Sequence, residues 1–124
     1  MRFERGIGVK RSLGIGMSFD TLQRGQILKI KKSFSTDRWG VIQGHVEGWN
    51  KCREGRYLIV KSTPVYSDGG RRIGFRIRQG YTLEQSRKIR ESLLSQEEME
   101  YDWEKNKIFG MSRLQFNRRL EVVE

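Results

Sequence analysis

The C-terminal third of the chain contains a repeated helix-start signal, which restricts how residues 82–121 can fold. Three times a Ser or Thr is followed three positions later by Glu or Gln, in the pairs Thr82 and Gln85, Ser95 and Glu98, and Ser112 and Gln115. In such a capping box the hydroxyl accepts a hydrogen bond from the backbone N–H of the third helical residue, whose side chain reaches back. Each pair predicts a helix start, so the sequence predicts three short helices.

Gly110 lies between the second and third predicted helices. Glycine readily takes the left-handed conformation that often ends a helix. Ser112, two residues later, is the predicted start of the next helix. A turn this short makes the last two helices cross steeply. That crossing is the geometry of a helix-turn-helix, whose final helix can lie in the major groove of DNA.

The segment of about residues 98–121 resembles the helix-turn-helix DNA-binding families. The resemblance rests on Gly110-Met111-Ser112, Phe116 and Arg118-Arg119-Leu120. It implies that four side chains face nucleic acid, namely Arg113, Gln115, Asn117 and Arg118. It also implies that three side chains face the core, namely Met111, Phe116 and Leu120. The match departs from the family pattern at Lys105 and Asn106, and no family resemblance covers the rest of the chain.

A second interpretation fits the same residues. Helical hairpins with a Gly turn and a Ser cap also occur in proteins that do not bind DNA. On that interpretation the predicted helices only pack against the rest of the protein.

Positive charge is concentrated in the first two thirds of the chain. The net charge is +10 over 124 residues, and residues 1–80 hold 17 Lys and Arg against 6 Asp and Glu. Residues 81–124 hold 8 against 9. Such a field favours binding to nucleic acid, because counterions are released from the phosphates, although an acidic protein surface satisfies the same electrostatics.

Four short segments between residues 26 and 78 are typical of strands, being rich in Val, Ile and aromatic residues: 26–32, 39–46, 56–62 and 72–78. Turn residues separate them at 33–37, 47–55 and 67–70, and the Ser67-Asp68-Gly69-Gly70 run is the clearest hairpin turn. The sequence therefore predicts an α+β protein, with a small antiparallel sheet or barrel followed by two or three helices. The predicted divisions are a basic, Gly-rich arm at 1–21, a basic β module at 22–80 and a helical part at 81–124.

The last predicted strand alternates between apolar and basic side chains. Ile73, Phe75 and Ile77 are expected on one face, and the opposite face is expected to present Arg72, Arg76 and Arg78. A row of arginines suits a phosphate backbone or a row of acidic side chains. The alternative is an ordinary solvated face of the sheet.

A second candidate contact lies in the loop before the third predicted strand. Trp49 is followed by Lys51 and Arg53, a combination that can stack unpaired bases beside a cationic groove. Trp39 and Tyr57 are instead expected in the core.

Catalytic, metal and cofactor sites are not expected. The chain has one Cys and one His, Cys52 and His45, which excludes a zinc site built from thiolates and imidazoles within one chain. No other group of residues satisfies the requirements of an active site. The sequence shows no membrane span or secretion signal, and we expect a cytoplasmic protein.

Together these patterns predict a small basic nucleic-acid-binding protein, with DNA favoured over RNA. It would act as a regulator or accessory factor of the kind that phages and mobile elements encode. The alternative is a protein-binding inhibitor or adaptor, which would dock its basic sheet on an acidic surface of a larger machine such as a polymerase or nuclease.

Overall fold

The computed structural model describes residues 17–36, 42–43, 50–98 and 109–124. In chain order its elements are α1 (Met17–Asp20), β2 (Ile27–Ile30), β3 (Phe34–Thr36), β4 (Ile42–Gln43), β5 (Asn50–Cys52), β6 (Tyr57–Val60), β7 (Val65–Ser67), the 3₁₀ turn η1 (Asp68–Gly70), β8 (Arg72–Phe75), β9 (Ile77–Gly80), α2 (Leu83–Leu94), β10 (Phe109–Ser112), α3 (Arg113–Arg119) and β11 (Leu120–Val122).

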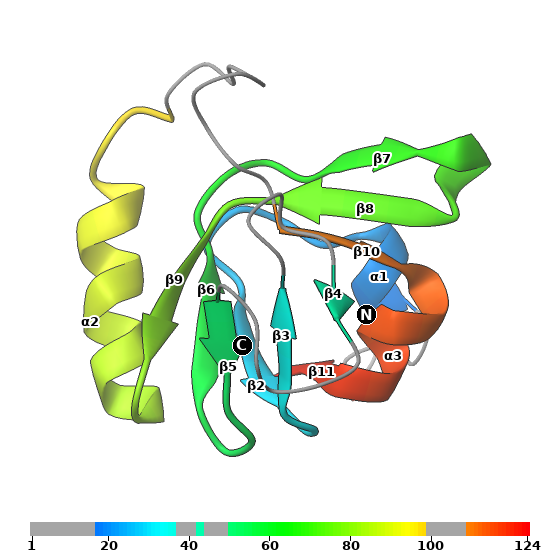
Figure 1. Cartoon of the computed structure of the whole chain (residues 1–124). Coiled ribbons are helices and arrows are strands. Elements are labelled where there is room, and N and C mark those ends of the chain that lie inside the picture. The colour runs from blue at the N-terminus through cyan, green and yellow to red at the C-terminus, as the bar shows by residue number, and fades with distance from the viewer. Residues whose placement is uncertain (1–16, 37–41, 44–49, 99–108) are drawn as a thin grey trace.

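The strands form three antiparallel sheets, so the predicted α+β class is confirmed. Their orders are β11-β2-β6-β9, β10-β8-β7 and β4-β3-β5. The sheets are open over the described residues, and the barrel alternative does not apply to them. In Figure 1, α2 lies beside β9 on one side of the molecule, and α3 lies on the other side.

Strands occur within or overlapping all four predicted segments, but two of the predicted turns are wrong. Residues 33–37 contain β3, and residues 47–55 contain β5. The two strands pair with each other and place Phe34 opposite Cys52, with both side chains buried. The polar residues of both strands resemble those of turns, so the sequence did not predict strands here. These strands form because they pair with a distant segment and not because of local propensity.

The hairpin turn predicted at residues 67–70 is confirmed. It joins β7 to β8, and Gly69 and Gly70 have φ values of 63° and 86°. A side chain at either position would be strained, which explains why two glycines follow Asp68.

The four-stranded sheet is buried on both faces. One face of β2 and β6 carries Leu28 and Leu58 into the main core, which also contains the rings of Phe75 and Phe116. The other face carries Ile27 and Ile59 against α2. Burial on both faces accounts for the nearly continuous apolar sequences Ile-Leu-Lys-Ile and Tyr-Leu-Ile-Val.

Helix α2 begins where the first capping box predicts. The Thr82 hydroxyl accepts a hydrogen bond from the Gln85 N–H at 3.0 Å, and the Gln85 side chain accepts one from the Tyr81 N–H at 2.7 Å. The helix passes close to β9, because Gly80 leaves room for Ser86. Capping and this close approach together fix the first turn of the helix against the sheet.

The second predicted helix start is wrong at its first residue, because Ser95 ends α2. The Ser95 N–H donates to the Glu91 carbonyl, and the Arg24 guanidinium donates to the carbonyls of Leu93 and Gln96. The Glu98 carboxylate accepts hydrogen bonds from the Thr63 N–H and hydroxyl, at 2.7 and 2.6 Å, instead of reaching back to Ser95. Partners from distant segments therefore override the local signal; the remainder of that predicted helix, residues 99–108, lies outside the described residues.

The segment predicted to be helical, residues 81–124, also contains two strands. β10 pairs with β8 and β11 pairs with β2, so this segment completes two sheets of the β module. Gly110 lies in β10 opposite Gly74, and not in a left-handed turn between helices. The third predicted helix start is confirmed, because the Ser112 hydroxyl accepts a hydrogen bond from the Gln115 N–H at the start of α3. The Gln115 side chain accepts a hydrogen bond from Arg119 instead of reaching back to Ser112, so only half of the capping box forms.

Replacing Gly80 with Ala should lower the free energy of unfolding by about 1–3 kcal/mol, because the core between α2 and β9 would be overpacked. A Cβ at Gly80 would lie 2.2 Å from the Ser86 hydroxyl oxygen and 3.3 Å from the Ser86 Cβ. Gly110→Ala is the matched control, since its Cβ would meet only the Ile73 carbonyl at 3.8 Å. Urea unfolding of both variants measures the difference. A loss at Gly110 as large as that at Gly80 would contradict the strand and favour the left-handed turn.

Candidate nucleic-acid interface

The predicted row of arginines keeps its alternation but is divided between two sheets. Arg72 belongs to β8 and Arg78 to β9, and the chain passes from one sheet to the other at Arg76. The apolar residues between them are buried or packed against the main core, namely Ile73, Phe75 and Ile77. Arg78 stands opposite Ile59, on the face that α2 covers. Arg72 and Arg78 therefore belong to different surfaces.

The predicted contact residues of α3 fall into two groups. Arg113 pairs with the Asp20 carboxylate, with N–O distances of 2.8 and 2.6 Å, and its guanidinium lies 4.5 Å from the centre of the Phe19 ring. This pairing lowers the pKa of Asp20 and raises that of Arg113. The Gln115 side chain accepts a hydrogen bond from Arg119 at 2.6 Å. Both residues thus have structural partners within the protein.

Asn117 and Arg118 are exposed at the other end of α3. The Asn117 carbonyl accepts a hydrogen bond from the Lys31 ammonium at 2.8 Å, which ties this end of the helix to the turn after β2. Of the four predicted α3 residues, these two are the better placed for a ligand. The three apolar residues assigned to the core are buried, namely Met111, Phe116 and Leu120.

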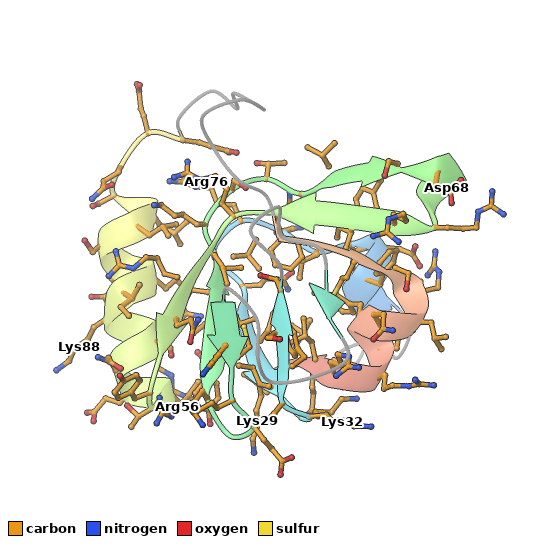
Figure 2. All side chains as sticks on the ribbon, in the orientation of Figure 1. Lys29, Lys32, Arg56, Asp68, Arg76 and Lys88 are labelled. Atoms are coloured by element: carbon orange, nitrogen blue, oxygen red, sulfur yellow. The ribbon has the colours of Figure 1, made fainter. Side chains whose placement is uncertain are left out.

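Two turns that are distant in sequence lie side by side next to this end of α3. The Gly55 N–H donates to the Ile30 carbonyl at 2.9 Å, and the Ile30 N–H donates to the Arg56 carbonyl at 2.9 Å. The contact gathers cations from the end of β2 and from the β5–β6 turn into one surface, here called the basic edge: Lys29, Lys31, Lys32, Arg53 and Arg56. Figure 2 shows Lys29, Lys32 and Arg56 along the lower edge of the view, far from Asp68 at the upper right.

Positive charge on the basic edge is largely uncompensated by the acids of the described residues. None of its five residues forms an ion pair with a carboxylate of the described part of the chain, whereas Asp20, Asp68 and Glu124 each pair with arginines elsewhere. Two acids lie nearby, Glu54 in the β5–β6 turn and Glu121 opposite Lys29. Five cations with two neighbouring acids leave a positive surface.

Of the five residues of this edge, the sequence analysis singles out Arg53 alone and not Lys29, Lys31, Lys32 or Arg56. The available signal was the run Lys29-Ile30-Lys31-Lys32 at the end of a predicted strand. Lys51 is exposed on β5, and its carbonyl oxygen lies 3.5 Å from the Gln79 side-chain nitrogen. Trp49 lies outside the described residues, as do Trp39 and His45, whereas Tyr57 packs against the cluster under α2.

Cys52, the one cysteine of the sequence, is buried. Burial raises the pKa of the Cys52 thiol to about 12, so the thiol stays protonated near neutral pH and is a poor nucleophile. The described part of the chain holds no group of three or more His, Cys, Asp and Glu side chains arranged for a metal ion. None of its helices is long and apolar enough to cross a membrane.

Comparison with protein-family models, with curated proteins and with solved structures finds no match to this chain.

Proposed function

We propose that this protein binds nucleic acid through the basic edge and the adjoining end of α3, with duplex DNA as the favoured ligand. One observation carries the proposal: the contact between the two turns gathers five cations without a described ion-pair partner. Such a surface binds phosphates by releasing condensed counterions, which supplies affinity without sequence recognition.

The exposed end of α3 adds the candidates for sequence recognition. The Lys31 ammonium bonds to the Asn117 carbonyl, and Arg118 follows Asn117 in α3. The side chains of Asn117 and Arg118 would approach bases while the edge lysines contact the backbone. Amide side chains pair bidentately with adenine, and guanidinium groups pair with guanine. The proposal keeps the helix-turn-helix resemblance for the final helix, α3. It does not keep the turn, because a strand, β10, directly precedes α3. With sequence-selective binding, the protein would act as a small regulator or accessory factor in the cytoplasm.

The test replaces Lys32 and Arg53 with Ser and measures binding to a labelled duplex over a range of salt concentrations. We expect the slope of log K against log [salt] to become shallower by about 1.8, because each lost duplex contact removes about 0.9. The matched control replaces Arg71 and Arg72 with Ser, which removes the same charge from the β8 end of the molecule. The control should leave the slope unchanged.

Two outcomes would contradict the proposal. Equal losses in both variants would mean that binding follows net charge and not the basic edge. No binding of duplex DNA, single-stranded DNA or RNA at low ionic strength would reject binding through phosphates, and would favour the alternative of a protein that docks on an acidic surface of a larger machine.

A further inference from the structure

A pocket of about 320 Å³ lies between α2 and the edge of the four-stranded sheet. Three cations line it from three different elements: Lys61 follows β6, Arg78 lies in β9 and Lys88 lies in α2. Ser92 and Gln96 add a hydroxyl and an amide, and Ile89 and Leu93 add an apolar wall. The pocket is separate from the basic edge, which is formed by the turns between β2 and β3 and between β5 and β6.

Strand register and helix periodicity explain why these side chains converge. Arg78 stands opposite Ile59, and Lys61 follows Ile59 by two residues, so both extend from the sheet face that carries Ile59 against α2. On α2, Lys88 and Ser92 are four residues apart and therefore share one face of the helix. The convergence results from packing α2 on β9 and is not visible in any one segment.

The described residues do not neutralise the charges in the pocket. Among the residues that the structure describes, no acid lines the pocket, and none of the three cations forms an ion pair with a carboxylate. Glu98, which lies beyond the end of α2, is bound to Thr63. Partial burial, together with the charges of Arg76 and Arg78, lowers the pKa of Lys61. An anion placed here would relieve this repulsion.

We propose that the pocket binds a phosphate monoester carried on a small, partly apolar group, as in a mononucleotide or the phosphorylated end of a nucleic-acid strand. Three converging cations and two neutral hydrogen-bonding side chains suit a dianion with several acceptor oxygens. The wall of Ile89 and Leu93 suits a ring stacked beside the phosphate. The volume is at the lower end of the range for small-molecule pockets, about 300–1,000 Å³, which favours one nucleotide unit over a longer ligand.

The test measures binding of adenosine monophosphate, inorganic phosphate and adenosine to the full chain by calorimetry. We expect the monophosphate to bind more tightly than inorganic phosphate, and adenosine to bind weakest, because the cations supply most of the affinity. Arg78→Gln should weaken binding of the monophosphate at least tenfold, equivalent to about 1.4 kcal/mol at 25 °C. Arg72→Gln is the matched control, since it removes the same charge from an exposed position on another sheet, and it should leave the affinity unchanged.

A second variant distinguishes a loss of binding from a loss of folding. Lys88→Gln changes an exposed helix residue and should also weaken binding of the monophosphate. Oligonucleotides with and without a 5′-phosphate distinguish the two sources of the group: a preference for the phosphorylated end that Arg78→Gln abolishes assigns the pocket to strand ends, and its absence assigns the pocket to free mononucleotides. No binding of the monophosphate at millimolar concentration, or equal losses in the Arg72 and Arg78 variants, would overturn the inference. Neither result would bear on the basic edge, whose test uses Lys32 and Arg53.

Discussion

Deleting residues 120–124 is expected to abolish the cooperative unfolding transition. These residues form β11 and its extension, in which Leu120 and Val122 are buried and Val123 packs against the cluster under α2. Burying such side chains contributes about 1.5–3 kcal/mol each. Backbone hydrogen bonds join Ile27 to Glu124 and Val123, and each contributes about 0.5–1.5 kcal/mol net. The free energy of unfolding of a small domain is only about 5–15 kcal/mol in total. The deletion should therefore leave the chain unfolded or only marginally stable.

Circular dichroism during urea titration measures the effect of the deletion. Glu124→Gln is the control, since it keeps β11 and removes only the ion pairs from Glu124 to Arg87 and Arg90. That variant should lose less than about 1 kcal/mol, as is usual for ion pairs near the surface. If the shortened chain unfolds cooperatively at the wild-type midpoint, β11 does not contribute to the sheet as described.

Phe116→Ala is expected to lower the free energy of unfolding by about 3–5 kcal/mol, the usual effect of replacing a buried Phe with a cavity. The Phe116 side chain is fully buried, and its ring meets the Phe19 ring edge-on, with centroids 5.4 Å apart and planes at 78°. A helix of seven residues is too short to be stable alone, so α3 depends on this contact. Urea unfolding gives the value from the shift in midpoint at constant m.

Leu114 supplies the matched position for that measurement. It lies on the same helix with 63% of its surface exposed, and Leu114→Ala should change stability by less than about 0.5 kcal/mol. Similar losses at Leu114 and Phe116 would show that α3 does not pack on the core. A large loss of stability in the Phe116 variant alone would confirm that α3 packs on the core. Nucleic-acid binding is tested separately, with the variants of the basic edge.

The candidate site was only partly predictable from sequence. Composition and the resemblance predict Arg53, Asn117 and Arg118 as contact residues, and all three are exposed at or beside the basic edge. The resemblance also predicts Arg113 and Gln115, but these two side chains bind Asp20 and Arg119. A residue type and its spacing show what a side chain can bind; they do not show which distant side chain has already bound it.

Features whose physical cause lies within a few residues can be predicted from the sequence alone. Thr82 and Ser112 start helices because a hydroxyl caps an N–H three residues away, and the two glycines after Asp68 form a turn because they accept positive φ. The apolar and basic alternation at residues 72–78 has the same local origin, the two-residue period of a strand.

Other features depend on contacts between segments that are distant in the sequence. Arg24 reaches the carbonyls at the end of α2 and so makes Ser95 an end instead of a start. Gly110 lies in a strand because β10 pairs with β8. The basic edge exists because Ile30 bonds to Gly55 and Lys31 bonds to Asn117. In each case a backbone N–H or C=O group needs a hydrogen-bond partner once it is removed from water. Those partners come from distant parts of the chain, so a pattern within a few residues cannot predict them.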